Sequence, residues 1–306
     1  MATATLELTD RSARTQPAER IVIEGVSKLF NARQSKGRRT AAAQAFVAIE
    51  DFSLNVREGE FLSVVGPSGC GKSTLLDLLA GLESPSGGTI YLDGNPLVGP
   101  DQRVGIVLQG YALFPWRTVR KNIEFGLEIK EVEKKERQRI SQHYVELVGL
   151  GGFEERYPHE LSGGMRQRVA IARALAYDPE VLLMDEPFAA VDAQTRETLQ
   201  EELLGIWERT RKTVVFITHS IDEAIFLSDR IAVMSSCPGS LKRLLEVNLS
   251  RPRKGDRASA RFSQLRHEIW ELIQQDNQGQ RKFEERLVIK EAEEFLQERT
   301  KDHEYS

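Results

Sequence analysis

A glycine-rich stretch at 66–73, Gly-Pro-Ser-Gly-Cys-Gly-Lys-Ser, has the residue types that bind phosphate. It follows the apolar run 61–65 and precedes a helix-like sequence, which is the context that such a loop requires. Its glycines allow backbone N–H groups to converge on phosphate oxygens at the positive end of the next helix. Lys72 has the reach to contact the terminal phosphates, and the Ser73 hydroxyl can ligate Mg²⁺. The predicted phosphate-binding residues are Gly66, Pro67, Ser68, Gly69, Cys70, Gly71, Lys72, Ser73 and Thr74.

Two acidic residues follow a second apolar run, in the sequence Val-Leu-Leu-Met-Asp-Glu-Pro at 181–187. A carboxylate at the tip of a buried strand costs free energy unless a cation or hydrogen-bond donors accompany it. We therefore expect Asp185 to bind Mg²⁺ through its water shell. Glu186 would face the terminal phosphate, where a carboxylate can orient the attacking water or accept its proton. The structural alternative is that both acids cap a turn, which the phosphate loop disfavours.

The elements that must position these residues are short apolar strands. Runs at 61–65, 181–184 and 214–217 each end at a glycine or a polar residue. Continuous apolar runs are typical of strands buried on both faces of a parallel sheet, where ligands lie beyond the carboxyl ends of the strands. We therefore predict an α/β fold with a mainly parallel sheet. The glycine-rich loop, Asp185 with Glu186, and His219 are expected to gather at one edge of it.

The rest of the pattern predicts further strands, a helical insertion and two terminal helices. Strand patterns occur at 21–23, 46–49 and 52–56, and the sequence between 117 and 180 has a helical texture. An amphipathic helix is predicted within 256–275, and a second one at 281–296. The predicted division is a polar tail at 1–20, a main domain at 21–250 with a helical part at about 111–175, and a C-terminal helical extension at 251–306.

The stretch 31–45 carries four basic residues and no acid, which predicts a surface hairpin tip or a flexible loop. Contact with lipid phosphates or an acidic partner is the alternative for it. Whole-chain composition excludes other classes. The net charge of −4 does not suit a basic nucleic-acid binder, and no apolar run approaches the 18 residues of a membrane span.

The start of the chain has no apolar region of a secretory signal, and the chain has two cysteines, Cys70 and Cys237. We expect both to be reduced thiols of a cytosolic protein. Cys70 stands at the start of a predicted helix, a position that tends to lower a thiol pKa. Oxidation sensitivity is therefore one interpretation of Cys70, and a small residue that fits the loop is the other.

A second anion-binding sequence is Leu-Ser-Gly-Gly-Met-Arg-Gln-Arg at 161–168. Ser162, Gly163 and Gly164 would begin a helix whose free N–H groups can bind phosphate. An ordinary capped helix explains these residues equally well. A second phosphate site for one nucleotide makes sense if it comes from another subunit.

These motifs, in this order and spacing, resemble the ATP-binding subunit of an ABC transporter. The resemblance covers about 21–250 and rests on GPSGCGKST, LSGGMRQR, VLLMDEP and the strand-terminal His219. The segments VGIVLQGYALFPWRTVRKNI and DEPFAAVDAQTR are similar to the importer subfamily for nitrate, sulfonate, taurine or bicarbonate. The resemblance implies a P-loop NTPase fold with an antiparallel β subdomain and a helical subdomain that carries LSGG.

The same resemblance implies ATP and Mg²⁺ as ligands and a set of partners. These are a second ATPase subunit packed head to tail, a transmembrane permease and, indirectly, a solute-binding protein, at the cytoplasmic face of the membrane. Nucleic acid is not expected as a partner.

Four positions of the family's pattern have candidate residues in this chain. Phe30 stands where an aromatic residue stacks on adenine, with Phe46 as the weaker candidate. Gln109 matches the glutamine that contacts Mg²⁺ and the attacking water, and His219 matches the histidine that contacts the terminal phosphate. Asp192 fits the loop that crosses between subunits, although this chain has alanine and valine at 189 and 191, where the family often has serine or glycine, and leucine.

Trp116 follows Gln109 in an aromatic-rich segment. An exposed tryptophan there suits contact with the permease, and core packing is the alternative. Two other classes compete with a transport ATPase. A soluble ABC-type ATPase acting on DNA or ribosomes would need a long coiled coil, tandem cassettes or a basic face, and none is evident. A regulatory module without turnover is disfavoured because Lys72, Asp185, Glu186 and His219 are all present.

Overall fold

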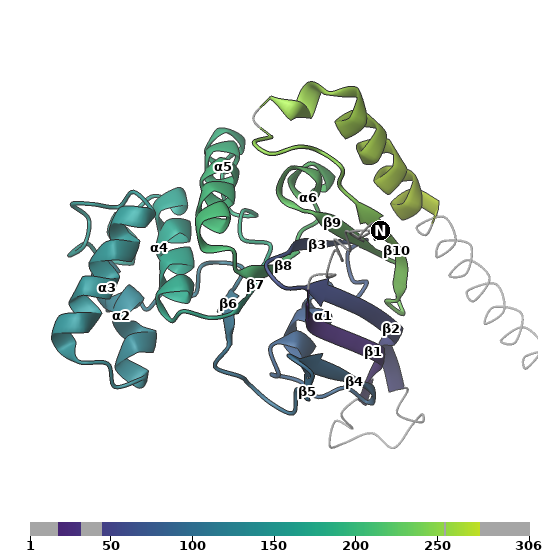
Figure 1. The fold of residues 1–306 in the computed structure, drawn as a ribbon, viewed down its shortest axis with the longest axis horizontal. Helices are drawn as coiled ribbons and strands as arrows, with labels where there is room; N and C mark the ends of the chain where they lie inside the picture. Colours follow the sequence, from purple (N-terminus) through teal and green to yellow (C-terminus); the bar gives the residue numbers. More distant parts are fainter. Residues whose placement is uncertain (1–17, 32–44, 254, 276–306) are drawn as a thin grey trace, which may run out of the picture.

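The computed structural model describes residues 18–31, 45–253 and 255–275. Its central sheet consists of β3 (Phe61–Val65), β6 (Val104–Val107), β7 (Val181–Asp185), β8 (Thr213–Ile217), β9 (Arg230–Met234) and β10 (Leu241–Glu246). The strand order is β10-β9-β3-β8-β7-β6 (Figure 1). Neighbouring strands are parallel except for β10, which is antiparallel to β9. The predicted mainly parallel core is confirmed.

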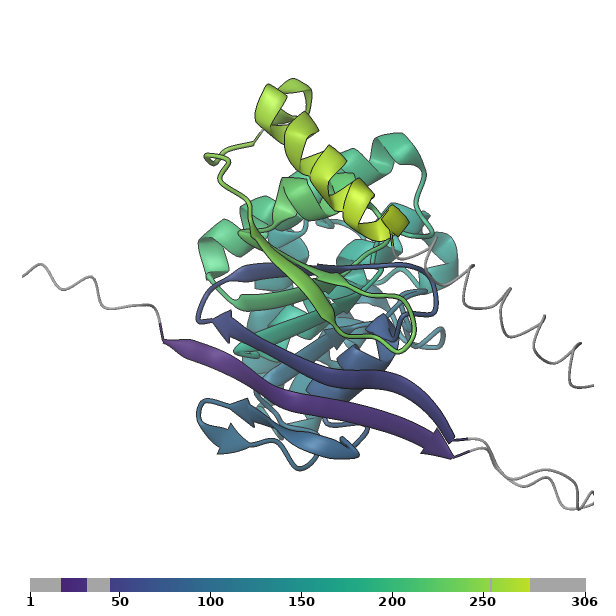
Figure 2. The same ribbon diagram turned by 90° about the vertical axis from the view of Figure 1, so that its right-hand side faces the viewer.

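A second, antiparallel sheet lies against the central sheet (Figure 2). It consists of β1 (Glu19–Asn31), β2 (Ala45–Arg57), β4 (Gly87–Leu92) and β5 (Asn95–Pro96), in the order β2-β1-β4-β5. The predicted strands at 46–49 and 52–56 are one continuous strand, β2. Asp51 between them has a φ of 45°, and the β1–β2 pairing shifts register there, so the strand bulges instead of ending. Most of the basic stretch lies outside the described residues.

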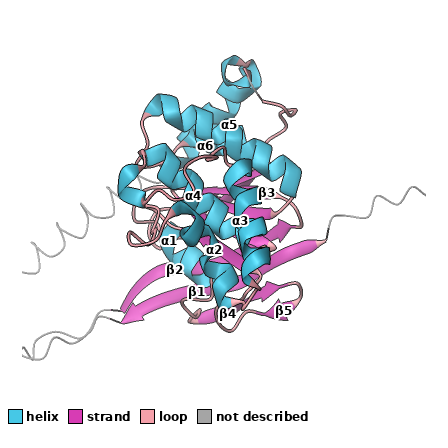
Figure 3. Ribbon diagram, turned by 90° about the vertical axis from the view of Figure 1, so that its left-hand side faces the viewer, coloured by secondary structure: helices cyan, strands magenta, loops and turns pink. Residues whose placement is uncertain are grey.

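In the described part of the chain, six helices accompany the two sheets, besides a C-terminal helix described below. They are α1 (Lys72–Leu79), α2 (Val119–Ile129), α3 (Lys134–Leu147), α4 (Gly163–Ala176), α5 (Ala193–Thr210) and α6 (Ile221–Leu227). Helices α2, α3 and α4 form a cluster at one end of the central sheet (Figures 1 and 3). The predicted helical subdomain with LSGG at the start of one of its helices is therefore present. No helix in the ranges described is long and apolar enough to cross a membrane.

Alternate residues of each central strand belong to two different hydrophobic cores, because successive side chains in a strand point to opposite faces. Phe61 and Val65 of β3 pack into the core beneath helices α2 to α6, while Leu62 and Val64 pack into the core shared with α1 and the antiparallel sheet. Both faces of these strands are buried, as their continuous apolar sequences predict.

The predicted amphipathic helix in 256–275 begins at residue 260, after a short 3₁₀ turn at Asp256–Ala258. Phe262, Leu265 and Ile269 line its buried face and belong to the helical-side core. This helix runs beside α6 at the β10 edge of the central sheet (Figures 1 and 2). The second predicted helix, at 281–296, lies outside the described residues.

Candidate nucleotide-binding site

The glycine-rich loop joins β3 to α1, and its last glycine is required by the backbone. Gly71 is the N-cap residue of α1 and has a φ of 93°. A Cβ atom on Gly71 would lie 2.8 Å from the carbonyl oxygen of Ala48 on β2. A left-handed φ and this close approach together exclude larger residues. The first N–H groups of α1 have no partner within the helix, so the loop supplies the donors that a phosphate needs.

Lys72 places a positive charge within this loop. Its Nζ atom donates hydrogen bonds to the carbonyl oxygens of Gly66 at 3.0 Å and Pro67 at 2.8 Å, and its side chain is buried. The Cys70 thiol lies 3.8 Å from the same Nζ. Burial raises the pKa of Cys70, and Lys72 offsets this only in part, so the thiol does not have the lowered pKa that the helix start suggested. The loop therefore carries one cation and a protonated thiol.

A cavity of about 330 Å³ joins the loop to the end of β7. Of the two candidate aromatic residues, Phe46 lines this cavity and is 54% exposed. Phe30 lies opposite Phe46 in the β1–β2 pairing, with the Lys28 ammonium 5.0 Å from its ring centroid, and is outside the lining. The residues that line the cavity are Phe46, Ala48, Ser68, Gly69, Gly71, Lys72, Ser73, Thr74 and Glu186.

Glu186 and His219 lie together because β7 and β8 are neighbours. Asp185 pairs in register with Ile217, so the two strands end side by side. The N–H of Glu186 donates to the carbonyl oxygen of Ile217 at 2.9 Å, and one carboxylate oxygen, Oε2, lies 3.1 Å from Nδ1 of His219. Glu186 has a φ of 41°, a conformation that costs a non-glycine residue about 1–3 kcal/mol. This backbone directs its carboxylate into the cavity that the loop lines.

Asp185 has the electrostatic setting of a cation ligand. Burial raises the pKa of its carboxyl group, and the neighbouring charges of Glu186 and Asp77 raise it further. A hydrogen bond with the Ser73 side chain, and the charge of Lys72, act in the opposite direction. A hydroxyl beside a carboxylate suits Mg²⁺, which proteins bind through one or two carboxylates together with substrate phosphates. The described ranges contain no cluster of three or more His, Cys, Asp or Glu residues suited to a metal.

The second anion-binding sequence lies apart from this cavity in the same chain. Ser162 is the N-cap residue of α4, and its hydroxyl accepts a hydrogen bond from the N–H of Met165 at 3.3 Å. Asp192 caps α5 and accepts from the N–H of Thr195 at 3.0 Å. That hydrogen bond lowers the Asp192 pKa. The side chains of Ser162 and Asp192 are exposed, and neither residue lines the cavity beside Lys72.

Gln109 lies in an exposed loop after β6. This loop is connected to other parts of the site by Tyr111, a residue to which the motifs assigned no role. Tyr111 is buried, and its hydroxyl donates to the carbonyl oxygen of Ala190 at 3.5 Å. The hydroxyl is also close to Gly163, since a Cβ atom there would lie 3.2 Å from it. Tyr111 thus joins the Gln109 loop to the segments before Asp192 and after Ser162. A tyrosine in a loop carries no periodic signal, so sequence patterns could not identify this contact.

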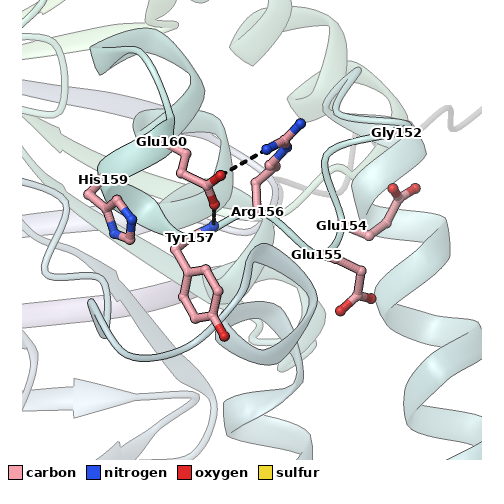
Figure 4. A pocket seen from close by; sticks show the side chains of 7 residues that line it. All are labelled: Gly152, Glu154, Glu155, Arg156, Tyr157, His159 and Glu160. Carbon is pink, nitrogen blue, oxygen red and sulfur yellow. Dashed lines mark hydrogen bonds and ion pairs between the residues drawn. The ribbon is translucent and has the colours of Figure 1, made fainter.

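A larger cavity, of about 540 Å³, is not the phosphate site. It lies in the segment just before α4, and the residues that line it are Gly152, Glu154, Glu155, Arg156, Tyr157, His159 and Glu160 (Figure 4). The Glu160 carboxylate accepts hydrogen bonds from the Tyr157 N–H at 2.7 Å and from Arg156 at 2.8 Å. The cavity with the larger volume is therefore not the one that contains the phosphate loop.

Comparison with known proteins assigns the family. The profile of the ABC transporter family matches residues 49–189. An uncharacterized ABC transporter ATP-binding protein of Methanocaldococcus jannaschii is 49% identical over 257 residues, which cover 84% of this chain and 92% of that protein. Nitrate import ATP-binding protein NrtD of Synechocystis sp. is 52% identical over 203 residues, covering 66% and 76%. Aliphatic sulfonates import ATP-binding protein SsuB of Bacillus cereus is 46% identical over 259 residues, covering 85% and 96%.

Solved structures agree with this assignment. A dimeric ATP-binding cassette in a post-hydrolysis state, bound to ADP and Pi, superposes with a TM-score of 0.64 at 32% identity over 75% of this chain and 100% of that chain. The fold and site define a P-loop ATPase with a helical subdomain. The chain belongs to the family of ABC transporter ATP-binding proteins. ATP binding, and hydrolysis coupled to transport, follow from that membership.

Proposed function

We propose that this chain powers import of a small anion, of the nitrate, sulfonate, taurine or bicarbonate class, through a separate transmembrane permease. The contact between Glu186 and His219 beside the phosphate loop supports hydrolysis most directly. The anion class is supported by the relatives NrtD and SsuB, which are named for nitrate and sulfonate import. A different importer substrate is the alternative, and ATPase stimulation by each candidate anion in the reconstituted transporter distinguishes them.

The charged and polar residues in and around the cavity have proposed roles in the reaction. The loop N–H groups and Lys72 bind the phosphates and offset the charge that develops on them. Ser73, Asp185 and Gln109 would hold Mg²⁺, which would polarise the terminal phosphate. Glu186 orients the attacking water. His219 holds the Glu186 carboxylate and contacts the terminal phosphate.

The site is proposed to be completed by a second copy of this chain or a close relative. Ser162 and Asp192 are exposed at helix starts that are not part of their own chain's cavity. The free N–H groups at the start of α4, beside Ser162, suit the phosphates of a nucleotide held on the opposite subunit, and Asp192 lies in the loop proposed to cross between subunits. The dimeric arrangement of the related cassette supports this proposal. ATP then favours the closed dimer by the difference in its affinity for the closed and open states.

The helical subdomain is proposed to bind the permease at the cytoplasmic face of the membrane, with a solute-binding protein acting through the permease. Trp116 is 72% exposed, which leaves it free for such a contact. Phe114 beside it packs against Phe125 with ring centroids 4.5 Å apart, so the exposed indole stands on a fixed base. Large aromatic side chains on a rigid base are typical interface anchors. We propose 21–250 as the ATPase domain and 251–306 as its C-terminal extension.

The proposal is tested by separating ATP binding from hydrolysis. Glu186→Gln keeps the size of the side chain but not its basicity, so we expect phosphate release to fall by about 100-fold or more while ATP binding persists. Size-exclusion chromatography with MgATP should show this variant as a dimer. Lys72→Ala is the matched control, because it removes the phosphate contact and should lose both binding and dimerisation. Wild-type phosphate release by Glu186→Gln would contradict the role assigned to Glu186.

A further inference from the structure

Glu223, in the first turn of α6, is a buried acid with no role in the site described above. It is 6% exposed, and its carboxylate accepts hydrogen bonds from the Thr218 hydroxyl at 2.5 Å and from Nε2 of Gln200 at 3.1 Å. The Nε atom of Arg196 lies 3.8 Å from Oε1 of the Glu223 carboxylate. Burial raises the pKa of Glu223, and Thr218, Arg196 and His219 act in the opposite direction. A carboxyl group is costly to bury, so these specific partners determine where it lies.

The hydrogen bonds of Glu223 involve the residues on both sides of His219, Thr218 and Ser220. The Thr218 hydroxyl accepts a hydrogen bond from the N–H of Ser220 at 3.0 Å, so this one oxygen spans the backbone on both sides of His219. A hydroxyl has one proton to donate. Because Glu223 accepts that proton, a lone pair of the Thr218 oxygen is directed at Ser220. The carboxylate therefore fixes the turn from which His219 projects.

This arrangement differs from an ordinary helix cap. Ser220 and Glu223 have the spacing of a capping box, and the Ser220 hydroxyl does accept from the Glu223 N–H at 3.3 Å. In a capping box the glutamate would accept directly from the N–H of the serine. Here the Thr218 hydroxyl stands between them, which leaves the other carboxylate oxygen of Glu223 for Gln200. Helix capping alone does not require that second contact.

Gln200 extends the hydrogen-bond chain to the C-terminal segment. Its Oε1 atom accepts from Arg257 at 2.6 Å, while its Nε2 atom donates to Glu223. An amide has distinct donor and acceptor ends, so Arg257 at one end and Glu223 at the other select a single orientation. The Arg257 guanidinium also pairs with Glu197 at 2.8 Å. A continuous set of hydrogen bonds therefore runs from Arg257 to the turn that carries His219.

We propose that Glu223 is a positioning residue for His219, and that the C-terminal segment acts on His219 through this chain of hydrogen bonds. Arg257 and Gln200 are its outer members. The inference rests on the proposed role of His219 in hydrolysis. It goes further, because it assigns the C-terminal extension an influence on turnover that reaches the site through the interior of the chain.

The first test measures the position of His219 without reference to activity. Arg257→Met removes the outer contact, and Arg266→Met is the matched control. Arg266 also ties the C-terminal helix to α6, through a 2.6 Å ion pair with Asp222, but lies outside the chain of hydrogen bonds. In the full-length protein, imidazole resonances of the five histidines are recorded by ¹H–¹³C NMR, with His219→Gln identifying the signal. We expect the His219 resonance to shift or broaden in Arg257→Met and Glu223→Gln, and to stay unchanged in Arg266→Met.

The second test measures kcat and the KM for ATP separately in the MgATPase assay. Loss of positioning should lower kcat by about 2- to 30-fold with the KM for ATP unchanged. Arg257→Met and Glu223→Gln are expected to show this, and Arg266→Met is not. Arg257 is partly exposed, so its variant is expected to fold even if the buried substitution at Glu223 does not.

The two assays separate this inference from the proposed function. An unchanged His219 resonance in Arg257→Met, or equal shifts in Arg257→Met and Arg266→Met, overturns the positioning role. If the resonance moves and His219→Gln still hydrolyses ATP at the wild-type rate, the role of His219 in hydrolysis fails, and the link to turnover is overturned with it.

Discussion

At the scale of single residues, the site depends on which side chains share one cavity. Phe46 lies at the same cavity as Lys72 and Glu186, whereas Phe30 lies across the β1–β2 pairing from it. An aromatic ring at the mouth of a phosphate site is suited to stack on a base. We therefore propose Phe46 as the residue that contacts adenine, in place of the sequence-based candidate Phe30.

Phe46→Ala should weaken ATP binding by about 10-fold, because base–aromatic stacking contributes roughly 1–3 kcal/mol. Phe30→Ala, on the neighbouring strand, is the control and should bind as the wild type does. Titration with a fluorescent ATP analogue measures both affinities. The opposite result, with only Phe30→Ala impaired, would return the adenine contact to Phe30.

At the scale of elements, the phosphate loop is held between the central sheet and β2. Gly71 approaches the backbone of Ala48, so the loop depends on the antiparallel sheet for its shape. Gly69 has a similar left-handed backbone, with a φ of 77°, but nothing lies within 4 Å of its missing Cβ atom. The two glycines share a left-handed backbone but differ in contact with β2, and the effect of this contact is measurable.

Gly69→Ala should cost about 1–2 kcal/mol of stability, from its left-handed backbone alone. Gly71→Ala should cost more than Gly69→Ala, because its Cβ atom would displace β2 as well. Urea denaturation without nucleotide measures both variants. Equal losses would show that the contact with Ala48 adds nothing to the stability of the loop.

At the scale of the whole molecule, a buried arginine attaches the C-terminal segment to the ATPase core. Arg253 is 2% exposed, and its guanidinium donates to the carbonyl oxygens of Ile225, Phe226 and Ser228 at 2.7–3.0 Å. These carbonyls lie at the end of α6, where helical partners are absent. Burial, together with Arg251, lowers the Arg253 pKa to about 10, so the guanidinium remains charged at neutral pH.

Arg253→Met should reduce the free energy of unfolding by about 3 kcal/mol, because several buried carbonyls lose their donor at once. Arg261→Met in the same segment is the control, since the Arg261 side chain donates an exposed hydrogen bond to Gln264 of its own helix. Its stability should stay within about 0.5 kcal/mol of the wild type. Chemical denaturation measures both, and equal losses would refute the anchoring role of Arg253.

Sequence patterns predicted those parts of the site that depend on local order along the chain. The loop at 66–73 directly follows the buried strand β3, and Asp185 ends the buried strand β7 with Glu186 after it, so topology alone places them at one edge. Phe46 and Tyr111 could not be placed in this way. The position of Phe46 depends on the β1–β2 register, and that of Tyr111 on packing between distant segments. The role of Glu223 could not be inferred from sequence either, because the Thr218 hydroxyl between Glu223 and Ser220 is visible only in three dimensions.

The central sheet separates two hydrophobic cores, and its strands contribute side chains to both. Because Phe61 and Val65 face one core and Leu62 and Val64 the other, a change at an odd-numbered position of β3 is felt among the helices, and a change at an even-numbered one among the antiparallel strands. The phosphate loop begins at Gly66, the residue directly after β3. Substitutions at odd-numbered and at even-numbered positions of β3 therefore alter the packing behind the same loop independently. The first change the core under the helices, and the second change the core shared with the antiparallel sheet.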